Sequence, residues 1–217
     1  MYVPNFGKPT NTTNMKILHI VTSLRGEESV SNKLGNSIIG KIKEQLPQSE
    51  VIVSNIAKTP FPHLEQVHLA SFFTPEDERT EEMINSVSQS DDAIEKLLAA
   101  DIIVMDVPMY NFTIPSTLKA WIDHITRAGV TFQYTANGVE GLVKNKKVYL
   151  AIASGGIYSE GAMKNIDFTE NYLRNILGFI GIDDITAYRV EGLAIPEIKE
   201  NALPKALKTV DELVIYE

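Results

Sequence analysis

Three serines follow the first apolar segment of the sequence, and their spacing could hold a phosphate group. Ser23 stands where the apolar segment ends, and Ser29 and Ser31 stand where a helix is predicted to begin. Backbone N–H groups at a helix start carry partial positive charge, and serine hydroxyls add hydrogen-bond donors. The alternative is that Ser29 or Ser31 only caps the helix, as serine routinely does. Because three serines gather here, we favour phosphate binding.

A second candidate segment follows the most apolar stretch of the chain. Residues 102–107 are rich in β-branched side chains, a pattern typical of a strand buried on both faces. The residues directly after this strand are Pro108, Met109, Tyr110, Asn111 and Phe112. Backbone polar groups beside flat apolar side chains suit a planar heteroaromatic ring with polar edges, such as a flavin. The alternative is a hydrophobic loop that only plugs the end of the sheet.

A third segment, Ser154 with Gly155 and Gly156, follows another apolar run. The paired glycines permit close approach of the backbone to a ligand, or simply a tight turn. In open α/β sheets ligands bind at the carboxyl ends of the strands, which is where all three segments fall. The four histidines show no metal-ligand grouping, and the sequence holds no Gly-x-Ser-x-Gly motif. We therefore predict neither a metal site nor a nucleophilic serine.

The elements that position these segments are predicted from the apolar pattern. Strands are expected at 16–23, 51–56, 102–107, 147–154 and 185–190. Helices are expected around 34–46, from about 115, over 168–180 and over 197–213. No Gly-x-Gly-x-x-Gly follows the first strand. We therefore predict an α/β fold, a flavodoxin-like doubly wound five-stranded parallel sheet with helices on both faces.

Two connections are less regular. Residues 57–73 contain Pro60 and Pro62 and are predicted to be an irregular excursion. The segment 74–77, with a Thr cap, a first-turn proline and two acids, predicts a helix start. One long helix or two abutting ones are expected from there to the central strand. Residues 129–146 form a long polar connection with a predicted small hairpin.

Composition narrows the function classes. The 217 residues carry a net charge of −8 and no basic stripe, so we expect no nucleic acid as partner. No stretch approaches the roughly 20 apolar residues of a membrane span, and we expect no membrane partner. The absence of cysteine is compatible with a reducing compartment, and we expect a cytoplasmic protein. We predict one domain at 15–217, preceded by a flexible extension at 1–14.

The motifs together resemble one family in order and spacing, from Met15 nearly to the end of the chain. That family is the FMN-dependent NADH-azoreductases, also described as NADH:quinone oxidoreductases. The matching segments are the serines at 23, 29 and 31, Pro-Met-Tyr-Asn-Phe at 108–112, Arg-Ala-Gly-Val-Thr-Phe-Gln-Tyr at 127–134, Gly-Val-Glu-Gly-Leu at 138–142, the glycines at 155–156, and Leu-Gly-Phe-Ile-Gly-Ile at 177–182.

The resemblance implies a role for each segment. Cofactor-binding residues would be Ser23, Ser29, Val30 and Ser31 at the FMN phosphate, Pro108, Met109, Tyr110, Asn111 and Phe112 along the isoalloxazine ring, and Ser154, Gly155, Gly156 and Tyr158 at its pyrimidine side. Phe132 and Tyr134 would wall the substrate pocket. FMN would carry the chemistry, so no catalytic side chain is assigned. NADH or NADPH would deliver hydride, and a quinone or azo compound would take two electrons in a ping-pong cycle.

The sequence departs from some members of the family at two places. Ala153, Ser154 and Tyr158 stand where some members carry Ser-Arg before the glycines and His after them, and Val30 replaces a polar residue. These changes bear on the choice of acceptor. Alternatives to the enzyme are a flavodoxin-like, non-enzymatic electron carrier, which the acidity would fit, and a regulatory binding protein without turnover. The aromatics of 129–146 argue against the carrier, which needs an open flavin edge.

The family is homodimeric, and two features of the sequence agree with a homodimer. Trp121 stands beside Leu118, Ile122 and Ile125, more apolar residues than one inward stripe needs. Phe132 and Tyr134 would be left exposed by a lone subunit, whereas aromatics are enriched at protein interfaces. The alternative is that Trp121 lies in the core and the hairpin folds over its own subunit.

Overall fold

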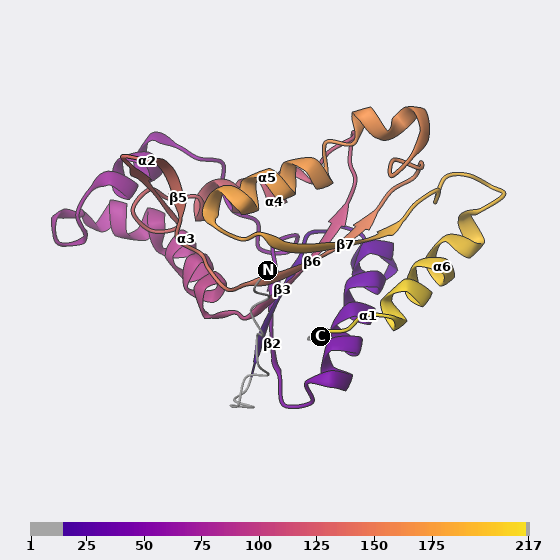
Figure 1. Ribbon diagram of the computed structural model, residues 1–217. Helices are drawn as coiled ribbons and strands as arrows, with labels where there is room; N and C mark the ends of the chain where they lie inside the picture. The colour runs from indigo at the N-terminus through magenta and orange to yellow at the C-terminus, as the bar shows by residue number, and fades with distance from the viewer. Residues whose placement is uncertain (1–14, 216–217) are drawn as a thin grey trace.

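The computed structural model describes residues 15–215, and they are organised around one parallel sheet (Figure 1). Its strand order is β2-β1-β3-β6-β7. The five strands are β1 (Lys16–Val21), β2 (Glu50–Asn55), β3 (Ile102–Pro108), β6 (Lys147–Ala153) and β7 (Asp184–Val190). All neighbouring strands pair in parallel. This order confirms the predicted flavodoxin-like doubly wound sheet. The predicted extension at 1–14 lies outside the described residues.

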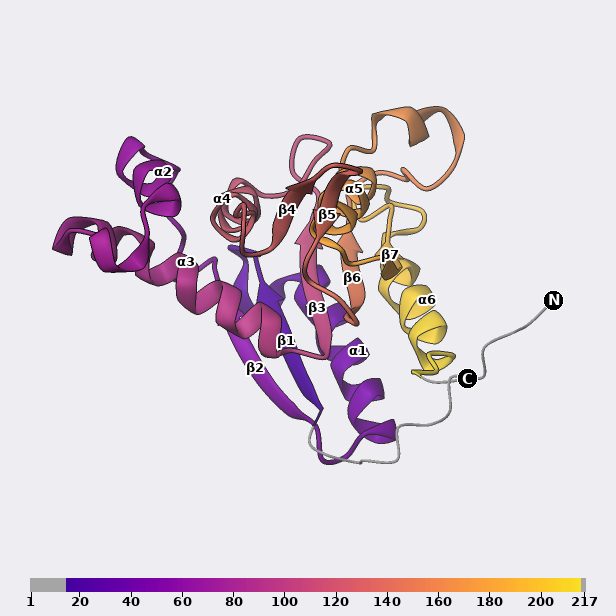
Figure 2. The same cartoon turned by 60° about the vertical axis from the view of Figure 1, so that its left-hand side comes forward.

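Helices cover both faces of the sheet, as predicted (Figure 2). One face carries α1 (Val30–Gln45) and α6 (Lys199–Asp211), and the other carries α3 (Glu81–Ala99), α4 (Ser116–Ile125) and α5 (Glu170–Ile180). Side chains of the central strand β3 alternate between the two cores, with Ile103 and Met105 on one face and Ile102 and Val104 on the other. Every residue of β3 is buried, which explains its continuous apolar run.

The connection between β2 and β3 differs from the prediction. Residues 57–73 are not wholly irregular, because α2 (Gln66–Phe73) lies within them and packs against α3. The Thr74–Asp77 signal does not start the long helix. Its acids fall in a short 3₁₀ turn, Glu76–Glu78, and α3 begins after Thr80, whose hydroxyl accepts a hydrogen bond from Met83 N at 3.3 Å. Thr80 is also followed by two acids, and the helix starts there because its apolar residues begin only after that point.

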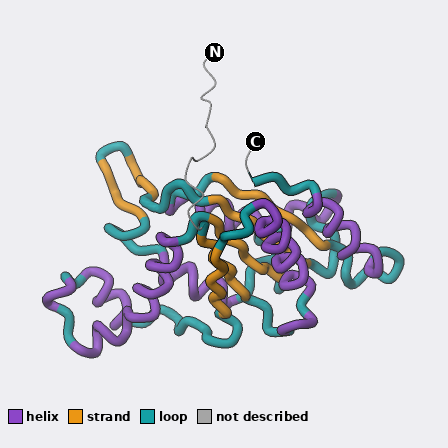
Figure 3. The backbone as a smooth tube through the Cα atoms, turned by 90° about the horizontal axis from the view of Figure 1, so that it is seen from below, coloured by secondary structure: helices purple, strands orange, loops and turns teal. Residues whose placement is uncertain are grey.

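The predicted hairpin is present as β4 (Phe132–Thr135) and β5 (Gly138–Gly141), and Figure 3 shows it projecting from the body of the molecule. It docks on the end of α5 through two glycines. A Cβ at Gly141 would lie 2.2 Å from Gly181 N, so only glycine permits this approach. Two further short 3₁₀ helices occupy Gly26–Glu28 and Gly161–Ile166. Within residues 15–215, no helix is long and apolar enough to cross a membrane.

Candidate functional site

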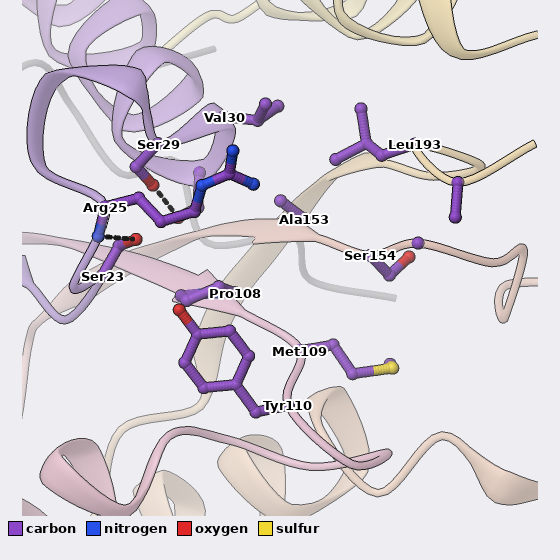
Figure 4. Close-up of a pocket in the computed structure, with 13 residues that line it drawn as sticks. Ser23, Arg25, Ser29, Val30, Pro108, Met109, Tyr110, Ala153, Ser154 and Leu193 are labelled. Carbon is purple, nitrogen blue, oxygen red and sulfur yellow. Dashed lines mark hydrogen bonds between the residues drawn. The ribbon is translucent and has the colours of Figure 1, made fainter.

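A cavity of about 260 Å³ lies at the carboxyl ends of β1, β3 and β6 (Figure 4). It brings together nine of the residues predicted from the sequence and four that were not. The predicted residues are Ser23, Ser29, Val30, Ser31, Pro108, Met109, Tyr110, Ser154 and Gly155, and the others are Arg25, Ala153, Leu193 and Ala194. The three segments singled out in the sequence therefore meet at one place.

The serine segment forms the start of α1. Ser29 is its N-cap, and the Ser29 hydroxyl accepts a hydrogen bond from Asn32 N at 3.3 Å. Ser29 Oγ also lies 3.0 Å from Ser31 Oγ, and both side chains are buried. The capping role weighed against phosphate binding is thus present for Ser29. It does not exclude an anion, because the first N–H groups of a helix have no partner within the helix.

Arg25 is the residue at this end of the cavity that the sequence reading missed. Its backbone N–H donates to Ser23 Oγ at 3.3 Å, which holds the segment after β1 in a tight turn. Its exposed side chain extends toward the space between Val30 and Ala153 (Figure 4). Arg25 forms no ion pair with any residue that the structure describes, so its charge remains available to an anion. A lone arginine two residues after a strand-end serine was the available signal.

The segment after β3 is held in an unusual backbone conformation. Met109 N donates to Ala153 O at 2.8 Å, and Tyr110 and Thr113 exchange two backbone hydrogen bonds. Between them Asn111 and Phe112 have φ angles of 49° and 71°, in the left-handed region that non-glycine residues rarely adopt. Such strain is concentrated at ligand sites, where it points backbone groups and side chains toward the ligand in directions that a relaxed turn would not allow.

The segment after β6 forms the wall of the cavity across from the serine segment (Figure 4). Ser154 N donates to Val190 O at 2.9 Å, and the Ser154 hydroxyl donates to Gly156 O at 2.9 Å. Ala194 N donates to Gly155 O at 2.9 Å, which brings the residues after β7 to the cavity. Leu193 and Ala194 could not be found by sequence motifs, because they reach the site through this backbone pairing alone.

Four predicted cofactor residues stand outside the lining. Asn111 lines a neighbouring cavity of about 510 Å³ together with Tyr110 and Tyr172. Burial, with a contribution from the charge of Asp123, raises the pKa of Tyr172 to about 12, so its phenol stays protonated. The other three are linked to the lining through Gly156, which follows Gly155: the Tyr158 ring lies against Gly156, and the Phe112 ring lies 6.2 Å from that of Tyr158.

The two predicted substrate-pocket residues behave differently from each other. Tyr134 is 75% exposed, as expected for it in a lone subunit. Phe132 is buried within its own subunit, with its ring 4.6 Å from that of Phe179, so the expectation that a lone subunit exposes it is wrong. Trp121 also lies in the core, 1% exposed, and does not indicate an interface. The pattern misled because α4 is buried on most of its circumference.

The donor set matches a ligand with one phosphate and one flat ring. Hydroxyls, a helix start and a guanidinium gather at one end, whereas apolar side chains and strained backbone gather at the other. FMN has this layout, and the residues present fit it. Among residues 15–215 no group of three or more His, Asp or Glu side chains could hold a metal ion.

Comparisons with known proteins point to the same chemistry. A family model for the flavodoxin-like fold matches residues 15–214. The FMN-dependent NADH:quinone oxidoreductase of Herminiimonas arsenicoxydans is 45% identical over 200 residues, covering 92% of this chain and 98% of that protein. The protein of the same name from Beijerinckia indica is 42% identical, covering 92% and 99%.

Solved structures agree. The azoreductase from Bacillus anthracis strain Sterne superposes with a TM-score of 0.83 at 30% identity, covering 92% of this chain and 100% of that chain. An FMN-dependent NADH-azoreductase from Bacillus anthracis strain Ames Ancestor, solved in complex with FMN, gives a TM-score of 0.80 at 26% identity, covering 91% and 98%.

Proposed function

The chain belongs to the family of FMN-dependent NADH:quinone oxidoreductases with a flavodoxin-like fold, and we propose how its residues serve that activity. The membership confirms the resemblance drawn from the sequence motifs. The activity is the FMN-dependent reduction of quinones, and of azo compounds, by NADH. The single observation that carries the proposal is the cavity in which the serine segment faces residues 108–110 of the strand-end loop.

We assign the phosphate end of FMN to the start of α1. Ser23, Ser29, Ser31 and Arg25 would hold the phosphate, with Val30 supplying a backbone N–H. The support is the convergence of hydroxyls and an unpaired guanidinium on the first turn of a helix. One phosphate group fits this loop, whereas a pyrophosphate would need the glycine fingerprint that the sequence lacks.

We assign the ring end to the loops after β3 and β6. Residues 108–112 would line the isoalloxazine ring, with Asn111 at its polar edge, and residues 154–156 with Tyr158 would meet its pyrimidine side. When bound, FMN supplies the transfer of two electrons from a nicotinamide to an acceptor. The chain's part is to fix the ring through backbone hydrogen bonds and to keep water from its buried side with Pro108, Met109 and Ala153. We expect donor and acceptor to use one open side in turn, which gives ping-pong kinetics.

We propose further that the active unit is a homodimer. The support now rests on the projecting hairpin, where Tyr134 and Val139 are 75% and 45% exposed, and on Phe112, which is 44% exposed beside the cavity. A two-fold dimer would give these side chains a partner surface. We also propose a cytoplasmic location, which the lack of cysteine in the sequence supports.

Steady-state assays test the proposal. The protein with FMN should oxidise NADH continuously when a quinone is supplied, and parallel lines in double-reciprocal plots would support the ping-pong order. A non-enzymatic electron carrier would be reduced by NADH slowly or not at all, and a regulatory protein would bind FMN without turnover. Either result would contradict the proposed use of this site.

A further inference from the structure

One carboxylate outside the cavity holds the loop that carries Tyr158. Glu191, just after β7, accepts hydrogen bonds from Tyr158 N at 2.8 Å and Ser159 N at 2.9 Å through a single oxygen, Oε1. Its other oxygen, Oε2, accepts the Ser159 hydroxyl. The Glu191 side chain is 12% exposed, and its charge strengthens these bonds to donors that are themselves part-buried or exposed. The backbone of the loop is therefore fixed at the residue predicted to meet the ring.

Arg189 on β7 extends this attachment. Its Nη1 lies 3.3 Å from Glu191 Oε1, and its Nε and Nη2 donate to Glu170 Oε2 at 3.0 and 2.7 Å. Nη2 also donates to Asp167 Oδ2. Burial alone would lower the pKa of Arg189, but its hydrogen bonds with Glu170 and Asp167 outweigh burial and raise it. One guanidinium thus joins three carboxylates: Glu191 after β7, and Asp167 and Glu170, which follow the loop in sequence.

The same network reaches the strand-end loop after β3. Asp167 Oδ1 accepts the N–H of Thr169 at 2.8 Å, which fixes the turn before α5. Within this turn Phe168 N donates to Phe112 O at 3.0 Å. Phe112 has a left-handed backbone, and its ring meets that of Tyr158 edge to face. Both aromatic residues beside the cavity are therefore tied to Arg189, one through Glu191 and one through Asp167.

We propose that Arg189 and Glu191 are positioning residues that preorganise Tyr158 and Phe112 around the flavin ring. The inference rests on the proposed function and deepens it. Neither residue lines the FMN cavity, so neither acts by direct contact. The bonds that Glu191 accepts come from a half-exposed loop rather than from the core. Losing them should therefore loosen the loop much more than it lowers the stability of the sheet.

The test compares Glu191→Ala and Arg189→Ala with Arg174→Ala. Arg174 is the matched control because its Nε also donates to Glu170, at 2.8 Å, while it touches neither Asp167 nor Glu191. Three quantities are measured: the FMN Kd from quenching of flavin fluorescence, backbone amide hydrogen exchange over 155–168, and the unfolding temperature of the FMN-free protein. Glu191→Gln, which keeps an acceptor but not the charge, is measured beside them.

We expect the FMN Kd of Glu191→Ala to rise about tenfold, because the loop loses three hydrogen bonds to one charged acceptor. Exchange at Tyr158 and Ser159 should accelerate in the same variant, whereas the unfolding temperature should stay near that of the parent. Glu191→Gln should recover part of the FMN affinity. Arg174→Ala should change neither the FMN Kd nor the exchange at Tyr158 and Ser159.

Unchanged FMN affinity and unchanged exchange in Glu191→Ala would overturn the proposal, as would an equal effect of Arg174→Ala. If Glu191→Ala does not fold, Glu191→Gln decides by the same two readouts. The proposed function fails separately, when the parent protein itself binds no FMN. The exchange measurement still applies to that protein, because it needs no ligand.

Discussion

His19 Nε2 lies 2.8 Å from Asp106 Oδ2, and both side chains are buried between the sheet and α1. Asp106 stands on β3, two residues before the strand ends at Pro108 in the cavity. Burial raises the pKa of Asp106, while the hydrogen bond and charge of His19 act in the opposite direction. The pair has room only because Gly35 of α1 lacks a side chain: a Cβ there would lie 1.8 Å from Asp106 Oδ1.

We therefore expect Gly35→Ala to destabilise the protein, by about 1–3 kcal/mol, because the added methyl group must displace the buried carboxyl or the helix. Gly40→Ala in the same helix is the control. A Cβ at Gly40 meets no atom within 4 Å, so that change should stabilise by up to about 1 kcal/mol. Urea unfolding of both variants measures the difference, and a Gly35→Ala protein as stable as its parent would refute the steric account.

Stability should fall in acid because of His124. Burial lowers the pKa of this fully buried imidazole, and the charges of His68 and Arg127 lower it further. Its hydrogen bond to Pro62 O and the charge of Asp123 act in the opposite direction. Since the folded state binds the proton less readily than the unfolded state, this contribution is complete above the unfolded pKa of about 6.5. It is lost as the pH falls below that value toward the lowered folded pKa.

The free energy of unfolding, measured from pH 5 to 8, should thus decline below about pH 6.5 in the parent. His124→Gln should remove that part of the decline, although it lowers stability throughout by loosening the contacts with Phe61 and His68. His63→Gln, on an exposed side chain, is the control and should leave the slope unchanged. An equal decline in His124→Gln would show that other groups titrate instead.

Replacing Asn111 should reduce FMN affinity or quinone turnover more than folding. Its amide is expected at the ring's polar edge, and losing one hydrogen bond costs about 0.5–1.5 kcal/mol. Asn111→Ala also strains the backbone, because φ is 49°. Asn111→Gly removes the amide without that strain, so the pair of variants separates the two effects. An Asn111→Gly protein that keeps both FMN affinity and turnover would exclude the hydrogen bond.

Arg25→Ala should weaken FMN binding about tenfold and leave riboflavin binding unchanged, because only FMN carries the phosphate that the guanidinium would pair with. Lys43→Ala changes the net charge equally at the other end of α1 and should affect neither ligand. Fluorescence titrations with both flavins give the four values. Equal losses for FMN and riboflavin would place Arg25 elsewhere in the site.

Sedimentation should show a dimer at assay concentration, and subunit mixing should show shared sites. A Tyr134→Ala chain paired with an Asn111→Ala chain would form one site with both lesions and one with neither. Activity of the mixture above both parent variants is therefore expected. Activity at the average of the two variants would show that each subunit completes its own site. A monomer in sedimentation would contradict the proposed dimer.

The sequence predicted the sheet and its ligand edge because both depend on local patterns. Buried parallel strands have continuous apolar sequences, and the serines and glycines of the ligand edge follow directly after these strands in the sequence. Helix α2 was missed for the opposite reason. Its residues, 66–73, follow two prolines and are held by a capping box, in which Glu65 N donates to His68 Nδ1 at 3.0 Å, and by packing on α3.

Within the site, the missed residues depend on tertiary pairing. Leu193 and Ala194 reach the cavity through backbone bonds with the loop after β6, and no motif records those bonds. Phe132 was misjudged because its partner, Phe179, lies on α5, remote in sequence. Arg189 and Glu191 act through a loop between β6 and α5, which only the folded chain brings next to them.

The most direct test of the central claim is flavin retention followed by reduction. The protein is saturated with FMN, or with FAD in parallel, and desalted, and its visible flavin absorbance is followed while NADH and then a quinone are added without oxygen. We predict that FMN but not FAD is retained at one per chain, that NADH removes its absorbance, and that the quinone restores it. Three results would contradict the account. They are separation of the FMN from the protein on desalting, preferential retention of FAD, and bound FMN whose absorbance NADH does not remove.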